Sequence, residues 1–258
     1  MKDLVFVLTI VPYRDSDLIV NFLSRSEGKM SAVIYGGRNL KRSSRFPFQS
    51  GDLIELEYQK VENREFITVK NAIGSTILSY EQFSYHRFII HTYLIELIYR
   101  IAKPGLQARP LFDILSANLA LHWQEEQPFA FITWAVWQLI EAGGYRIDYT
   151  GCEKCGQSSM KLKGTSEPSF RKQSYRLSAY SGSICCGNCE QSGEEMQTIS
   201  PAMIKMMWLF ADQDGYTEKL ANLPEDQLIP LLKVLNSYLL SSFDINPRSL
   251  DSFLQLVR

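Results

Sequence analysis

All five cysteines of this 258-residue chain fall between Cys152 and Cys189. They include two C-x-x-C pairs, Cys152 with Cys155 and Cys186 with Cys189. A C-x-x-C turn points two thiolates at one ion, and two such turns complete the tetrahedral four-thiolate site that is typical of structural zinc. The gap between the pairs is longer than in the most compact zinc modules, so we expect a small ribbon or hairpin there. The pattern predicts a structural Zn²⁺ site formed by Cys152, Cys155, Cys186 and Cys189.

One of these four ligands has an alternative. Cys185 and Cys189 could also chelate an ion, with one more residue between them. We predict Cys186 as the ligand, because its spacing to Cys189 matches that of the first pair, but the sequence leaves Cys185 open. Disulfides are disfavoured because the number of cysteines is odd and no signal peptide is recognisable. A thioredoxin-like redox pair is disfavoured because it needs a strand–helix–strand context.

Four thiolates fill the coordination shell of zinc, so this metal is expected to hold a fold together rather than to catalyse. A zinc-dependent hydrolase would need water in place of one cysteine. The sequence has no G-x-x-x-x-G-K-[ST], H-E-x-x-H or G-x-S-x-G pattern. Its three histidines are expected on the surface or in the core. We therefore expect a protein without enzymatic activity.

The N-terminal part of the chain reads as β-structure. Apolar and β-branched residues dominate five short segments, at 4–11, 18–23, 29–35, 52–58 and 66–77. The polar turns between them leave no room for crossover helices, which favours a small antiparallel barrel. A five-stranded barrel of this size is typical of the OB-fold, although other five-stranded barrels remain alternatives.

Basic residues are concentrated between Arg25 and Arg45, against the single acid Glu27. The formal net charge of the whole chain is −1, so an argument for nucleic-acid binding depends on this local cluster. Phe46 or Phe48 could stack on a base, and the basic groups suit phosphate oxygens. The alternative is an ordinary solvated loop between two strands. We predict DNA contacts by Lys29, Arg38, Lys41, Arg42 and Arg45.

An ordered set of segments resembles the family of the bacterial DNA repair protein RecO. The N-terminal segments are residues 13–20 (YRDSDLIV), 26–33 (SEGKMSAV), 36–38 (GGR) and 44–46 (SRF). The paired C-x-x-C motifs after a helical stretch are similar to those of the zinc-bearing members. The resemblance covers nearly the whole chain in order, and no single motif is diagnostic.

The resemblance implies a recombination mediator that acts in the cytoplasm at the nucleoid. Such a protein binds single- and double-stranded DNA, anneals complementary strands and helps to load the recombinase RecA. Its implied partners are RecR and the single-stranded-DNA-binding protein, whose acidic C-terminal tail would occupy an apolar, basic-rimmed pocket of the helical part. The sequence does not identify the residues of that pocket.

The rest of the chain is mainly helical, which gives an α+β protein. Helices are expected over 83–101, 110–123, 128–142, 203–210, 224–239 and 249–256. We expect the helices on both sides of the cysteines to pack together, with the zinc module inserted between them. The predicted parts are an OB-fold domain (1–80), a first helical part (81–150), a zinc-binding insertion (151–192) and a second helical part (193–258).

No apolar run reaches the roughly 18 residues that would span a bilayer, so we expect no membrane association. A second class of function stays open. The chain could be a protein–protein scaffold whose helical domain is stabilised by zinc and whose basic loop is incidental. Binding of DNA with a steep dependence on salt would separate the mediator from the scaffold.

Overall fold

The computed structural model describes most of the chain. The described residues are 1–38, 46–60, 65–105, 108–120, 128–159, 174–189, 196–212, 220 and 222–257. They form two compact units, one of residues 1–122 with 247–256 and the other of residues 123–246. Lys41, Arg42 and Arg45, three of the predicted DNA contacts, lie outside the described residues.

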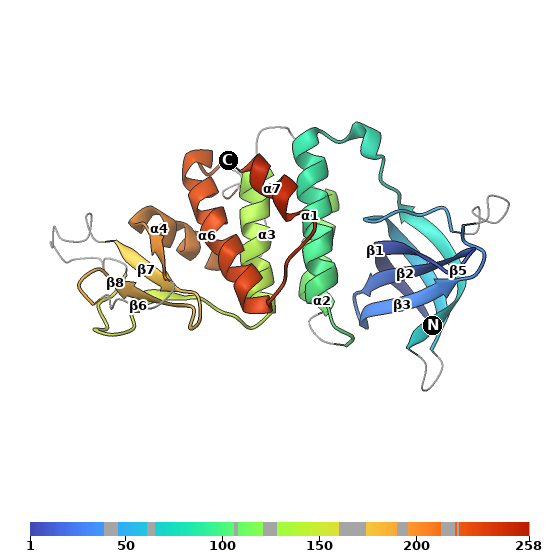
Figure 1. Ribbon diagram of the computed structural model, residues 1–258, viewed down its shortest axis with the longest axis horizontal. Helices are drawn as coiled ribbons and strands as arrows, with labels where there is room; N and C mark the ends of the chain where they lie inside the picture. The colour runs from blue at the N-terminus through green and yellow to red at the C-terminus, as the bar shows by residue number, and fades with distance from the viewer. Residues whose placement is uncertain are drawn as a thin grey trace. The chain divides into compact units, whose positions relative to one another are not determined.

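A closed barrel forms the first part of unit 1 (Figure 1). Its strands are β1 (Lys2–Tyr13), β2 (Asp17–Ser24), β3 (Gly28–Ile34), β4 (Leu53–Gln59) and β5 (Phe66–Thr76). Their order around the barrel is β1-β2-β3-β5-β4. All neighbours are antiparallel except β3 and β5, which pair in parallel and only at Ser31 with Phe66 and Ala32 with Ile67. The predicted five-stranded OB-fold is confirmed, with this one parallel contact added.

Alternating residues of the strands fill the barrel. Val5, Val20, Phe22 and Ile54 are completely buried in this core. Phe46, which follows β3 in the chain, is 6% exposed and packs edge-on against Phe22, with ring centroids 6.0 Å apart. The expectation that Phe46 stacks on a base is therefore wrong, because its ring is part of the core. Phe48 lies partly buried against the same cluster.

Among the described residues of unit 1, the α-helices are α1 (Tyr85–Ile101), α2 (Ala108–Ala120) and α7 (Leu250–Leu256). The side chain of Ser84 caps α1 by accepting a hydrogen bond from the Arg87 amide. α7 packs on α1 through the stacked rings of Tyr93 and Phe253, whose centroids are 4.1 Å apart. Phe112 of α2 packs on Phe6 of the barrel at 4.8 Å. α2 thus makes an apolar contact with the barrel, and α7 makes one with α1.

Unit 2 contains α3 (Pro128–Ala142), α4 (Pro201–Ala211) and α6 (Glu225–Phe243). α3 and α6 pack against each other, as do α4 and α6. Helices from before and after the cysteine segment do pack together, as α3 with α6 and as α1 with α7. They are divided between the two units, so the expected single bundle is not observed. Among the described residues, no helix is long and apolar enough to cross a membrane.

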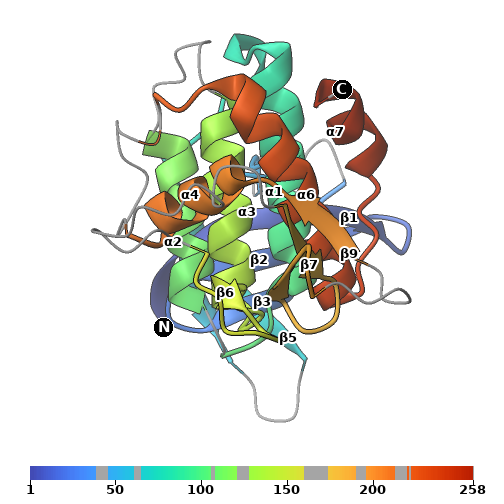
Figure 2. The ribbon, with the colours of Figure 1, turned by 90° about the vertical axis from the view of Figure 1, so that its left-hand side faces the viewer.

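A four-stranded sheet carries the cysteines, where the sequence predicts only a ribbon or hairpin. Its strands are β6 (Asp148–Cys152), β7 (Tyr175–Ser178), β8 (Ser183–Cys186) and β9 (Met196–Ile199), in the order β6-β8-β7-β9. Figure 2 shows β6, β7 and β9 of this sheet. β7 pairs antiparallel with both β8 and β9, and β6 pairs with β8 in parallel. The strands are only four or five residues long, which explains why their pattern is weak in the sequence.

Candidate metal centre and barrel surface

The two C-x-x-C turns leave the sheet side by side. Cys152 ends β6 and Cys186 ends β8, and these two strands are parallel neighbours. Each turn is closed by its own backbone: the Gly156 amide donates to Cys152 O at 2.8 Å, and the Cys189 amide donates to Cys186 O at 2.9 Å. Because parallel strands end on the same side of a sheet, both turns present their sulfurs to one place.

The four predicted sulfur atoms come together at this place. The Sγ atoms of Cys152, Cys155, Cys186 and Cys189 all lie within 4.8 Å of one another. The Cys155 and Cys186 sulfurs are 3.8 Å apart. With Zn–S bonds of about 2.3 Å, a tetrahedron of sulfurs has edges of about 3.8 Å. The group therefore fits a four-thiolate metal site without rearrangement of the backbone.

The protein surroundings favour ionisation at one of these thiols and oppose it at another. Burial alone would raise the pKa of Cys152, but amide hydrogen bonds from Cys186, Cys155 and Lys154 outweigh it and bring the pKa to about 6. The Cys186 amide lies 3.3 Å from the Cys152 sulfur. Hydrogen bonds with Cys155 and Cys186 raise the pKa of Cys189 to about 12. Four crowded thiols cannot all ionise unless a cation compensates their charge.

Cys185 points away from the group. Successive side chains of a strand alternate between its two faces, so Cys185 and Cys186 cannot both face the other sulfurs. The Cys185 thiol is buried and donates to the Glu153 carboxylate, with sulfur and oxygen 3.6 Å apart. The structure thus brings Cys186 rather than Cys185 to the other three sulfurs.

Of the five predicted DNA contacts, the two described ones, Lys29 and Arg38, lie at opposite ends of β3. Lys29 Nζ donates to the backbone carbonyl oxygen of Tyr99 at 2.8 Å and lies 4.1 Å from the centroid of the Tyr99 ring. Burial lowers the pKa of Lys29. Arg38 follows β3; its amide donates to Ser16 O at 2.9 Å and its Nη1 to Asp15 O at 3.4 Å. Lys29 is held against α1, whereas Arg38 is exposed beside the β1–β2 turn.

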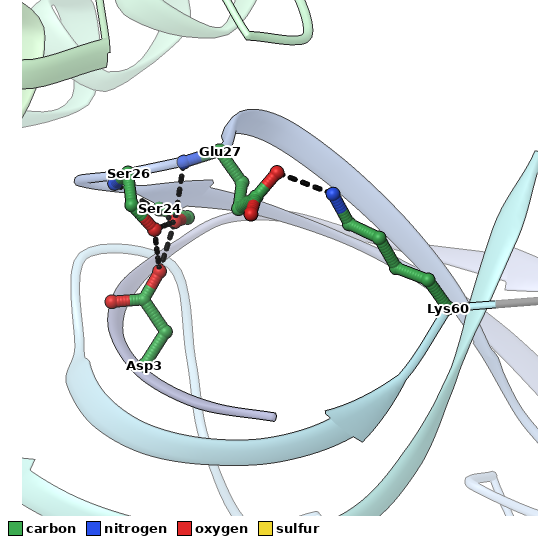
Figure 3. A network of polar contacts seen from close by, with 5 residues as sticks. All are labelled: Asp3, Ser24, Ser26, Glu27 and Lys60. Carbon is green, nitrogen blue, oxygen red and sulfur yellow. Dashed lines mark hydrogen bonds and ion pairs between the residues drawn. The ribbon is translucent and has the colours of Figure 1, made fainter.

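A polar network holds the turn between β2 and β3 (Figure 3). Ser24 Oγ accepts hydrogen bonds from the amides of Ser26 at 3.2 Å and Glu27 at 3.0 Å, and Asp3 accepts hydrogen bonds from both serine hydroxyls. The Glu27 carboxylate forms an ion pair with Lys60. These contacts stabilise the turn, because the Ser26 and Glu27 amides and the Glu27 carboxylate all have partners.

The same turn is fixed to the connection after α1. The Gly105 amide donates to Glu27 O at 2.8 Å, and the Lys29 amide donates to Lys103 O at 3.2 Å. Gly28 has a φ of +71° and approaches Lys103 so closely that a Cβ atom would lie 2.4 Å from its carbonyl oxygen. At this end the barrel is therefore joined to the helices of unit 1.

The exposed aromatic side chain at the other end of β3 is Tyr35, which the sequence does not single out. Tyr35 is 71% exposed and precedes Gly36, whose amide donates to the buried carboxylate of Asp17 at 2.8 Å. A tyrosine at the end of an alternating strand is ordinarily read as part of the barrel. Its position directly before a double glycine is the one sequence feature that marks the strand end.

Comparison with known proteins agrees with this architecture. The model for "Recombination protein O N terminal" matches residues 1–76, and that for "Recombination protein O C terminal" matches residues 82–251. A DNA repair protein RecO of Alkaliphilus metalliredigens is 24% identical over 253 residues, which is 95% of each chain. That of Symbiobacterium thermophilum is 22% identical over 91% of this chain and 89% of its own. That of Syntrophus aciditrophicus is 26% identical over 79% and 76%.

The N-terminal match covers the barrel, and the C-terminal match covers α1 to α6 together with the four-cysteine sheet. Together they span nearly the whole chain in a single order. The chain belongs to the recombination protein O (RecO) family.

Proposed function

We propose that this protein is a non-enzymatic mediator of recombinational DNA repair. It binds single- and double-stranded DNA, anneals complementary strands and helps to load a recombinase on coated single strands. The observation that carries the proposal is the match of both RecO models across a chain whose N-terminal part is a closed OB-type barrel. Barrels of this kind bind oligonucleotides in other proteins.

In this proposal, DNA is held through its phosphates with little preference for sequence. Arg38 is exposed, and Lys41, Arg42 and Arg45 follow it closely in the chain. Lys29 contributes to the local positive potential rather than by direct contact, because its ammonium group already donates to Tyr99. Counterions released from DNA would supply most of the affinity, so binding should weaken steeply as salt rises.

The metal has a structural role in this proposal. Zn²⁺ bound by Cys152, Cys155, Cys186 and Cys189 would neutralise the crowded thiolates and tie β6 to β8. The residues of the two turns position the sulfurs, and the Cys186 amide stabilises the Cys152 thiolate. All four coordination positions would be filled by protein, so no reaction is assigned to this site.

The family resemblance also suggests the partners and the location. We propose contacts with RecR and with the acidic C-terminal tail of the single-stranded-DNA-binding protein, and action at the nucleoid in the cytoplasm. We also propose that residues 1–80, 81–150, 151–192 and 193–258 are the functional parts of the chain. DNA binding is assigned to the first part and partner binding to the helical parts.

The test is a titration of a labelled single-stranded oligonucleotide, followed by fluorescence anisotropy at several salt concentrations. Tight binding with a steep salt dependence supports the mediator. Arg38→Glu combined with Arg42→Glu should weaken binding to all sequences and reduce the salt slope by about one per lost phosphate contact. Absence of binding at low salt overturns the proposal and leaves the protein–protein scaffold as the better description.

A further inference from the structure

The barrel is least continuous between β3 and β5. Only two residue pairs join these strands, Ser31 with Phe66 and Ala32 with Ile67. Two hollows flank this seam, with volumes of about 840 and 960 Å³. Both are lined by Glu65, Phe66 and Ile67, so the hollows meet at the start of β5. Pockets of about 300–1,000 Å³ hold a ligand of ordinary small-molecule size, so each hollow can hold a nucleotide.

The first hollow offers groups that recognise bases. Tyr35, 71% exposed, lies on its wall with the half-buried ring of Phe66. Thr68 and Asn71 add a hydroxyl group and an amide group on the same wall. An exposed ring beside hydrogen-bonding side chains suits an unpaired base, which can stack on the ring and bond through its edge. A paired base inside a duplex cannot reach such a ring.

The second hollow is basic. It is lined by Lys29, Lys60, Arg100 and Lys103, and Lys70 lines the first hollow. Of these five cations, Lys60 is paired with Glu27 and Arg100 with Glu96 of α1, so Lys29, Lys70 and Lys103 stand against Glu65. Within the described part of the chain, neither Lys70 nor Lys103 forms an ion pair. The seam therefore has a surplus of positive charge that suits an anionic chain.

We propose that a single-stranded nucleic acid crosses the β3–β5 seam, with a base stacked on Tyr35 and its phosphates near Lys70 and Lys103. This inference rests on the proposed DNA-binding function and specifies which surface receives the single strand. The aromatic ring and the amide in the first hollow favour a nucleic acid over an acidic peptide, which would use the basic hollow alone. Duplex DNA would bind elsewhere, through phosphate contacts only.

The first arm of the test removes the stacking ring. Tyr35→Ala should weaken binding of a labelled oligothymidine about tenfold, because stacking of one base on an aromatic ring contributes roughly fivefold to 150-fold. Binding of a labelled duplex should change much less. Tyr180→Ala is the matched control, since Tyr180 is 82% exposed and lies in the other unit.

The second arm reverses a charge of the seam. Lys103→Glu should reduce the salt slope for oligothymidine by about one. Lys233→Glu makes the same charge change on the exposed face of α6 and should leave the slope unchanged. A photoreactive oligothymidine should crosslink the unmodified protein to peptides that contain Tyr35 or Phe66. The crosslink does not depend on the stability of any variant.

The outcomes separate this inference from the function on which it rests. If the unmodified protein binds no oligonucleotide, the mediator function fails and the inference fails with it. If it binds, but Tyr35→Ala and Lys103→Glu bind like their controls, the proposal that the single strand crosses the seam is overturned and the mediator function stands. If these substitutions weakened the binding of an acidic peptide and left the binding of DNA unchanged, the single-strand assignment would also be overturned.

Discussion

The two ends of β3 meet very different surroundings. At its start, Gly28 and Lys29 lie against the segment after α1, through the Lys29 amide on Lys103 O and the Lys29 ammonium on Tyr99 O. At its end, Tyr35 is 71% exposed, and Arg38 donates hydrogen bonds to the neighbouring β1–β2 turn. One strand thus carries an internal joint at one end and a free surface at the other. The basic residues near β3 therefore do not form one surface, although they are close in the sequence.

The largest expected effect on stability is at the metal centre, outside β3. It tests whether the stability of β3 depends on the metal. Cys186→Ser should remove a ligand and destabilise unit 2 by on the order of 3 kcal/mol or more, because structural zinc binding is coupled to folding. Hydrogen exchange should accelerate in β7 and β8, whereas β3, which belongs to unit 1, should keep its protection.

Cys185→Ser is the matched control for this experiment, since Cys185 faces Glu153. It should retain one zinc per chain by elemental analysis. A metal-free Cys186→Ser protein with the melting temperature of the unmodified protein would show that zinc has no structural role.

The next effect concerns the joint itself. Gly28→Ala should destabilise unit 1 by about 2–4 kcal/mol, because the residue adopts a φ of +71° and its Cβ would lie 2.4 Å from the backbone oxygen of Lys103. Denaturant unfolding followed by circular dichroism measures this loss.

Gly144→Ala separates the two causes. Gly144 has a φ of +79°, and no atom lies within 4 Å of the position that a Cβ would occupy, so it should show only the backbone cost of about 1–2 kcal/mol. Equal losses in the two variants would mean that the contact between β3 and the segment after α1 does not matter.

A pH-dependent effect on stability tests the contact between α1, which is part of the joint, and the segment ahead of α7. Glu96 of α1 accepts hydrogen bonds from the Arg248 and Ser249 amides at 2.8 and 2.9 Å, ahead of α7. Although burial opposes ionisation, these bonds and those from the Ser249 hydroxyl and Arg100 lower its pKa from 4.5 to about 2. A lowered pKa stabilises the fold above pH 4.5 and ceases to do so as the pH falls toward 2.

Glu96→Gln should therefore lower the free energy of unfolding at pH 7 and flatten its dependence on pH between 4.5 and 2. Urea titrations across this range measure both quantities. Glu81→Gln is a control for a change of charge alone, since Glu81 is an exposed acid near the start of α1. An unchanged pH profile in Glu96→Gln would show that the carboxylate does not hold α7.

Much of this architecture follows from local sequence. The strands of the barrel alternate, Ser84 and Ser200 cap α1 and α4, and Cys152 and Cys186 begin turns whose spacing is set by two residues. In each case the physical cause lies within a few residues of its effect. The sulfur group can therefore be predicted without a structure, apart from the choice between Cys185 and Cys186, which depends on strand alternation in β8.

The barrel surface is less predictable because its causes are distant in the chain. Lys29 and Arg38 look alike in sequence, and Lys29 turns inward because Tyr99, 70 residues later, offers a carbonyl group and a ring. Phe46 looks like a stacking residue but is drawn into the core by Phe22. The exposure of Tyr35 depends on how β3 and β5 meet, which the local sequence does not reveal. Local pattern cannot reveal these outcomes, since each depends on tertiary packing.

The smallest effect on stability is expected at the free end of β3. Arg38→Glu should change the free energy of unfolding by less than about 0.5 kcal/mol, because the Arg38 amide bond to Ser16 persists and the side-chain bond to Asp15 is long, at 3.4 Å. It should nevertheless reduce the salt slope of DNA binding by about one. Lys29→Met should lower the free energy of unfolding more than Arg38→Glu does, and it should change the salt slope of DNA binding less. If Lys29→Met lowers the slope as much as Arg38→Glu, the Lys29 ammonium group contacts DNA directly despite its bond to Tyr99.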